Sequence, residues 1–221
     1  MHTRPQRLFR SASRLALTPA LVLAASVTVA PPAGHAPTAQ AAPQPDPIPR
    51  RWEMRVETSP LRVTNVDVPG VGPRPFYYLT FKATNMSGQE LYLAPMFEIG
   101  TDQGDVIRSS QDVPREVYTA LLERLQNAFL VSEFDVQGAI GQGADQAREG
   151  LVVWPANDLA VDEVTVYAAG FSGETQTVVR PDNGQTVVLR KTLMLRHPVP
   201  GEMDPVQNQA LDRSEERWIL R

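Results

Sequence analysis

The feature that most limits the fold of this chain is a series of short β-rich runs separated by turn residues. Each run is rich in β-branched and aromatic residues and is about as long as an ordinary strand. Turn segments such as TDQG and PDNGQ separate them. Nine such runs predict a mainly β domain, built as an antiparallel β-sandwich. The runs are RWEMRVE, LRVTNVDV, FYYLTFKATN, ELYLAPMFEIG, DVIRSS, GLVVW, DEVTVYAAGF, TQTVVRP and TVVLRKTLMLR.

One amphipathic helix is expected to interrupt the strands, near residues 113–130. Asp112 and Pro114 are start signals for it. Apolar residues then recur at helical spacing on one stripe. We expect this stripe to pack over one face or one end of the sandwich. Its members are Val117, Leu121, Leu122, Leu125 and Phe129.

Two neighbouring runs, FYYLTFKATN and ELYLAPMF, are expected to form a hairpin through a three-residue loop at 86–88. That loop pairs Phe81 with Leu93 and Ala83 with Leu91, and it places its glycine where a positive φ is needed. A two-residue loop would pair these apolar residues with the opposite face of the second strand. The three-residue loop is therefore predicted.

The same register gathers four side chains on the outer face of this hairpin, Tyr78, Lys82, Tyr92 and Met96. An outer face this apolar has two explanations. Either another layer of the protein covers it, or it is an exposed contact surface of the kind that marks partner sites. On the second explanation these four residues are the predicted binding residues, because aromatic side chains and Met can anchor a protein or glycan partner.

The first 41 residues have the pattern of a secretory signal peptide. Four arginines precede an apolar run at 15–30, and Ala39-Gln40-Ala41 supplies the small residues needed for cleavage. The apolar run is short for a membrane span of about 20 residues, although an uncleaved anchor is the alternative. We expect Sec-type export to the periplasm, the cell surface or the medium, with no transmembrane segment after cleavage.

The remaining chain divides by composition into three parts. Residues 42–50 end a proline-rich stretch and are expected to form an extended, mobile linker. Residues 51–197 hold the β-rich runs and the helix. Residues 198–221 form a polar tail whose apolar end, with Trp218, is expected to dock on the domain, in a late edge strand.

Cysteine and charge exclude several classes of function. The chain has no cysteine, which excludes disulfides, thiolate metal sites and thiol catalysis, so core packing must hold the fold. The formal net charge is −4, and it becomes −8 without the four leader arginines, with 17 basic against 25 acidic residues. This acidity argues against nucleic acid or anionic lipid as the main partner.

Three segments resemble functional motifs but lack a required part. GQGADQAREG has Gln146 where a dinucleotide fingerprint needs glycine, so we predict a short turn over 144–148 and then a buried strand. GFSGE has Glu174 where a nucleophile elbow needs glycine, and Ser172 is predicted to be a hairpin turn residue. TDQGD lacks the ligand pattern of a calcium loop and is also predicted to be a turn.

Histidine and paired carboxylates offer little catalytic chemistry. Only His197 lies beyond the leader, and a solvated position at a strand end is expected for it. One histidine without cysteine cannot build a His-rich zinc site. Adjacent acidic residues on a strand point to opposite faces, so only dispersed carboxylates such as Glu98 and Asp105 could assemble a hydrolase site. We predict no catalytic residue, no metal and no cofactor.

The segment FKATNMSGQELYLAPMFEIGTDQGDVIR resembles exported bacterial immunoglobulin-like or fibronectin-like β-sandwich domains. The resemblance implies an architecture and no active site, and the helix after Pro114 departs from it. The expected function is that of an exported, non-catalytic binding or envelope-associated module with a protein or glycan partner in the cell envelope. The alternatives are a hydrolase that uses dispersed carboxylates and a self-associating structural component. The sequence leaves the oligomeric state open.

Overall fold

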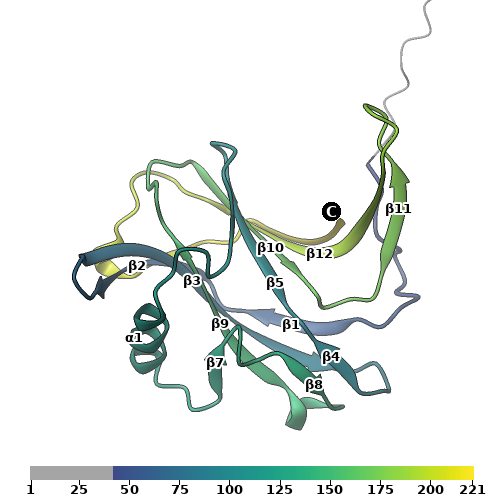
Figure 1. Ribbon diagram of the computed structural model, residues 1–221, viewed down its shortest axis with the longest axis horizontal. Coiled ribbons are helices and arrows are strands. Elements are labelled where there is room, and N and C mark those ends of the chain that lie inside the picture. Colours follow the sequence, from purple (N-terminus) through teal and green to yellow (C-terminus); the bar gives the residue numbers. More distant parts are fainter. Residues whose placement is uncertain (1–41) are drawn as a thin grey trace, which may run out of the picture. The chain divides into compact units, whose positions relative to one another are not determined.

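Two large sheets carry most of the regular structure (Figure 1). The computed structural model describes residues 42–221, so the predicted signal peptide at 1–41 lies outside the described residues. The expectation of a mainly β fold with one α-helix is confirmed for the described part of the chain. Over residues 42–221, no helix combines the length and the apolar character that crossing a membrane would require.

The first sheet has six strands in the order β13-β2-β3-β9-β7, and β1 also pairs with β3. Neighbouring strands are antiparallel, except that β7 runs parallel to β9. The long strand β3 has both edges occupied, by β2 and then β1 on successive stretches and by β9. The strands are β1 (Met54–Thr58), β2 (Leu61–Val68), β3 (Gly72–Asn85), β7 (Leu130–Ser132), β9 (Arg148–Pro155) and β13 (Gln209–Leu211).

The second sheet also has six strands, in the order β11-β12-β10-β5-β6, and β14 pairs with β12. All pairs in it are antiparallel. Strands β10 and β11 pair with successive stretches of β12, and residues 170–174 bulge out between them. The strands are β5 (Met96–Thr101), β6 (Val106–Arg108), β10 (Glu163–Ala169), β11 (Thr175–Val179), β12 (Thr186–Pro198) and β14 (Glu215–Leu220).

The predicted hairpin between residues 76–85 and 90–97 does not form. Strand β4 (Leu91–Leu93) pairs with β8 (Gly138–Ile140) in a separate two-stranded sheet. The prediction was wrong because β3 has no free edge for β4. At the turn, the Asn85 amide donates to the carbonyls of Gln89 and Ile140 and so directs the chain toward β8. Gly88 does have the expected positive φ, of 86°.

One apolar core lies between the inner faces of the two sheets and joins them. At its centre the rings of Phe81 and Phe97 lie 5.0 Å apart, and Phe97 also packs edge-on against Trp154 and Phe171. Opposite Phe81 on β9 stands Gly150, where a Cβ atom would approach the ring to 2.4 Å. The close approach of the aromatic rings therefore depends on a glycine.

Helix α1 (Arg115–Leu125) covers the outer face of the first sheet, beside β2 and β7 (Figure 1). Val117 and Leu121 are fully buried against Phe76 and Tyr78 of β3. The expectation that a further layer covers this face is confirmed for the β3 part. The helix is shorter than the predicted 113–130 because residue 126 turns left-handed, with φ of 51°. Phe129, placed in the helical stripe, is 81% exposed beyond the helix end.

The segment 46–58 contacts both sheets. The backbone amide of Asp46 donates to Glu174 Oε1 at 2.7 Å, and the amide of Met54 donates to the carbonyl of Phe171 at 2.8 Å, both in the bulge of the second sheet. Residues 54–58 then form β1 in the first sheet. At the other end of the chain, Trp218 on β14 packs against the core.

Candidate functional site

The four residues predicted to bind a partner lie in different places. Tyr78 is buried beneath α1, and its hydroxyl donates to Asn208 Oδ1 at 2.9 Å. Lys82 lies 3.6 Å from Glu149 on the neighbouring strand. Tyr92 is 67% exposed on β4, and Met96 is half-buried on β5. The shared face does not form, because the hairpin that would create it is absent; binding by any one of the four stays a prediction.

The outer face of the second sheet is hollowed around Tyr167. This hollow, here called the arginine hollow, has a volume of about 310 Å³. The side chains around it come from the β5–β6 hairpin, from β10 and β12 and from residue 221, so three segments that are distant in sequence, together with the end of the chain, build it. They are Met96, Glu98, Arg108, Tyr167, Ala169, Arg190, Thr192 and Arg221.

The arginine hollow has an excess of positive charge. The Arg221 guanidinium stacks on the Tyr167 ring, 4.1 Å from its centroid, and forms an ion pair with Glu98. Within the described chain, Arg108 and Arg190 form no salt bridge with a carboxylate. Two arginines are thus available to an external anion in a protein whose net charge is negative.

A second hollow, of about 160 Å³, adjoins the first and shares Met96 and Arg108 with it. We call it the carboxylate hollow, because the buried side chain of Glu133 lines it. Ser109 Oγ donates to Glu133 at 2.6 Å and the Tyr118 hydroxyl donates at 2.9 Å. Burial raises the pKa of Glu133, and the two hydrogen bonds and the charge of Arg108, which lines the same hollow, offset this only in part.

Glu133 is the single carboxylate that lines the carboxylate hollow in the described structure. A glycosidase-type site needs two carboxyl groups that face one substrate. The pair suggested by the sequence does not supply them: Glu98 is paired with Arg221, and Asp105 lies in the β5–β6 turn and lines none of these hollows. Glu133 is therefore held as a buried hydrogen-bond acceptor between β7 and α1.

A third hollow, of about 420 Å³, continues from the second across Phe134. Its walls combine polar side chains with apolar ones from α1 and the segment after β7, including Leu122 and Phe134, which is 59% exposed. The three hollows share lining residues in turn and form one track from Tyr167 to the helix.

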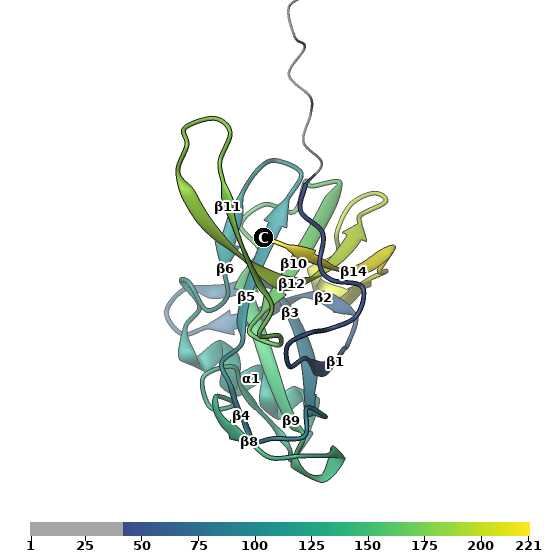
Figure 2. The ribbon, with the colours of Figure 1, turned by 90° about the vertical axis from the view of Figure 1, so that its right-hand side faces the viewer.

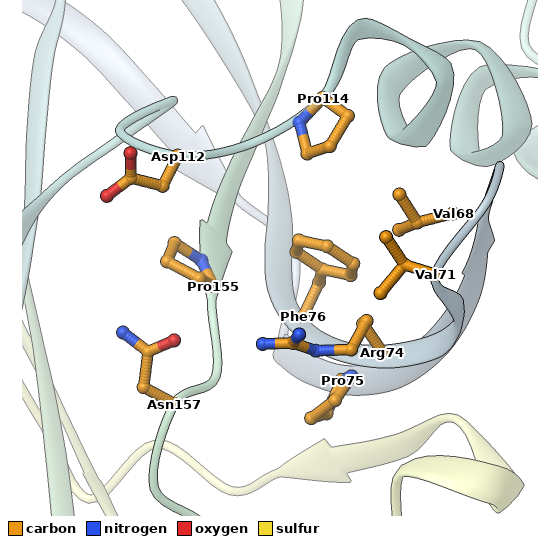
Figure 3. A pocket seen from close by; sticks show the side chains of 9 residues that line it. All are labelled: Val68, Val71, Arg74, Pro75, Phe76, Asp112, Pro114, Pro155 and Asn157. Atoms are coloured by element: carbon orange, nitrogen blue, oxygen red, sulfur yellow. The ribbon is translucent and has the colours of Figure 1, made fainter.

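A fourth hollow lies apart from this track, beside the start of α1 (Figure 3). This hollow has a volume of about 200 Å³. Figure 3 shows three prolines, Phe76 and Arg74 around it. Asp112 lies at its rim with φ of 58°. Its carboxylate does not cap the helix, because the cap position is Pro114, which has no side-chain donor or acceptor.

The glycine-rich and serine-containing segments are structural. The predicted turn at 144–148 appears as a 3₁₀ turn, Ala144–Gln146, followed by the buried part of β9. The TDQGD segment is the turn between β5 and β6, as predicted. Ser172 was placed in a hairpin turn, which is wrong: it lies in the bulge between β10 and β11 and bridges to Glu53.

His197 is buried and not solvated as predicted. It is 1% exposed on the inner face of β12, opposite Val164 of β10, and its Nδ1 atom has no hydrogen-bond partner in the described structure. Burial lowers the pKa of His197 from 6.5 to about 4, and the charge of Arg213 adds to this effect. The imidazole lies away from the hollows and belongs to the core.

Sequence reasoning missed a buried ion cluster around Lys191, where β12 leaves its pairing with β11. Lys191 Nζ lies 2.8 Å from Glu53 Oε2 and 3.0 Å from Glu174 Oε2, and its side chain is 4% exposed. Burial alone would lower the pKa of Lys191, but the two carboxylates outweigh it and raise the pKa. The one available signal was a lysine at an inward position of the apolar run TVVLRKTLMLR.

No group of three or more His, Asp or Glu side chains suited to a metal ion occurs within the described residues. Comparison with protein-family models, with curated proteins and with solved structures finds no match for the chain. Its function must therefore be argued from the arrangement of its own side chains.

Proposed function

We propose that the chain is an exported, non-catalytic binding module of the immunoglobulin-like β-sandwich kind, and that the arginine hollow binds an acidic segment of a partner protein. The sandwich assignment is supported by two six-stranded, mostly antiparallel sheets that share one core. The observation that carries the binding proposal is a pair of arginines, Arg108 and Arg190, that face one hollow without a carboxylate partner.

An acidic ligand suits the charge distribution of the whole protein. The net charge of the protein is negative and disfavours an acidic partner, so a local cluster of arginines both attracts such a partner and fixes where it binds. Arg guanidinium groups also bind carboxylates through paired hydrogen bonds, which adds direction to the charge attraction. Acidic side chains placed at Arg108 and at Arg190 would satisfy the two guanidinium groups.

An extended protein segment fits better than a glycan. Glycan recognition would use an open aromatic face, but Arg221 already stacks on Tyr167, the one aromatic side chain that lines the arginine hollow. The track onward from Met96 combines apolar side chains, including Met96 and Phe134, with polar ones such as Ser109, so it suits a peptide that carries both kinds. We therefore expect an acidic residue at the arginines and an apolar residue near Phe134.

Fluorescence anisotropy with labelled peptides tests this proposal. We expect a peptide of alternating Glu and Leu to bind, a matched peptide of alternating Lys and Leu not to bind, and the affinity to fall as salt is added. Replacing Arg108 and Arg190 together with Glu should weaken binding by more than about 10-fold. Arg55→Glu is the matched control, because Arg55 is an exposed arginine on the first sheet.

Equal affinity of the double variant and the unchanged protein would contradict the proposal, and so would equal binding of the basic peptide. Binding of a uronic acid oligosaccharide in place of both peptides would keep the arginine hollow as the site but replace the ligand class.

A further inference from the structure

In the described structure, one face of the hairpin formed by β11 and β12 is exposed, whereas Val178, Val187 and Leu189 on its other face are half-buried. This arm, residues 175–190, projects from the rest of the structure in both views (Figures 1 and 2). Val179 on it is 64% exposed and Val188 is 57% exposed. An isolated two-stranded hairpin is marginally stable in water.

The outer edge of β11 is unpaired in the described structure, since β11 ends the strand order of its sheet. Two backbone hydrogen bonds fix which residues face that edge. The amide of Arg180 donates to the carbonyl of Gln185, and the amide of Lys191 donates to the carbonyl of Glu174. By the alternation of an antiparallel ladder, residues 176 and 178 are also bonded to β12, and the backbone groups of Thr175, Thr177 and Val179 point outward.

This edge lacks the devices that keep edge strands from pairing. Natural edge strands are usually protected by lysine, proline, a bulge or an inward charge. The sequence of β11 is TQTVV, with no charged residue, proline or glycine. Thr175, Thr177 and Val179 thus each present an amide and a carbonyl group at this edge, in a strand where four of the five residues are β-branched.

We propose that two copies of this chain associate through their β11 edges, antiparallel and with the twofold axis at Thr177. In that register Thr177 faces its own copy, and Thr175 faces Val179 of the second copy. Each pair can exchange two backbone hydrogen bonds, and the two arms become one four-stranded sheet. A second copy suits this edge because the segment is uncharged and β-branched on both sides of the axis, so self-pairing brings no like charges together.

Sedimentation velocity across a range of concentrations is the first test, and a reversible dimer is expected. Thr177→Pro should weaken the dimer by at least about 10-fold, because it removes the outward amide donor of the central pair from each copy. The monomer should keep its fold, since that amide has no partner within the arm and proline is tolerated at such edge positions. Val188→Lys is the matched control: it adds a charge to the exposed face of the arm but not to the edge, and the dimer should persist.

Cysteine cross-linking then tests the register, and the chain offers a clean background because it contains no cysteine. Thr177→Cys should form a disulfide-linked dimer under mild oxidation, because facing residues in a hydrogen-bonded pair lie within disulfide range. Thr175→Cys should not, because each copy of residue 175 would lie two residues from the axis pair on opposite sides, which places the two cysteines four residues apart along the strands. A chain that stays monomeric, a dimer that survives Thr177→Pro, or equal cross-linking at both positions would overturn the proposal.

Discussion

The two sheets differ in what lies on their outer faces. The outer face of the first sheet is covered by α1, and Tyr78 there is 2% exposed. Within residues 42–221 no helix covers the outer face of the second sheet, and Tyr167 there lines a hollow together with three arginines. A sheet face beneath a further layer must be apolar, because it is buried. The outer face of a sheet without such a layer can carry polar recognition groups.

The side chains on the two outer faces match this division. The covered face presents Phe76, Tyr78 and Val153 to the helix. The uncovered face presents Glu98 and Arg190 to solvent. Substitutions on the covered face should therefore change stability, and substitutions on the uncovered face should change binding.

The largest effect is expected from Tyr78→Ser. The change removes a buried ring beneath α1 and should lower the free energy of unfolding by about 4 kcal/mol, measured by urea denaturation. Tyr92→Ser, at a position 67% exposed, should change it by less than about 0.5 kcal/mol. If the two substitutions proved equally mild, the covered face would not be a packed face.

The second prediction concerns how well water is excluded from His197, on the inner face of the second sheet. Because burial lowers the pKa of His197 to about 4, the unfolded chain binds a proton below about pH 6.5 while the folded chain does not. This contribution to stability is complete above pH 6.5 and is lost as the pH falls toward 4, by about 3 kcal/mol.

His197→Leu should remove that part of the pH dependence, leaving the slope that the carboxylates produce in both chains. Urea unfolding at pH 7, 6, 5 and 4 measures the difference between the two slopes. Identical slopes would mean that water reaches His197 through the uncovered sheet.

A smaller effect is expected from Gly150→Ala, at the core that both sheets share. A Cβ atom there would lie 2.4 Å from Phe81, which must shift, and we expect a loss of about 2 kcal/mol. Combining it with Phe81→Leu should recover part of the loss, which a double-mutant cycle measures. Additive losses would show that the ring does not press on Gly150.

The smallest effect on stability is expected from Arg190→Glu. The side chain is exposed and has no carboxylate partner in the described structure, so the free energy of unfolding should stay within about 0.5 kcal/mol. Thermal unfolding of this variant beside Arg55→Glu provides the measurement. A marked loss from Arg190→Glu alone would mean that the arginine hollow serves the fold and not a ligand.

The sequence predicted local structure better than pairing. Composition identified most strands and the helix, because strand and helix signals are carried by adjacent residues. The pairing of residues 76–85 with 90–97 failed because it assumed that neighbours in sequence are neighbours in the sheet. The partners of β3 are instead β1, β2 and β9, and β9 lies about 70 residues further along the chain.

The candidate site could not be predicted for the same reason. Arg108, Tyr167 and Arg190 stand on three different strands, and nothing in the spacing of these residues links them. The apolar character of both faces of FYYLTFKATN was a usable signal, and it correctly indicated a covering layer over Tyr78. It could not say that the layer spares Tyr92 and Met96, which belong to other sheets.

The contacts of the segment 46–58 also affect the order in which parts of the protein fold. The backbone amide of Asp46 and the carboxylate of Glu53 have their partners at Glu174 and Lys191, more than 100 residues later. During synthesis or translocation the N-terminal residues emerge long before the C-terminal ones. The segment 46–58 therefore lacks its partners until the second sheet has formed. Joining the two sheets through it is expected to be a late step in folding, and the segment stays open to proteases or chaperones until then.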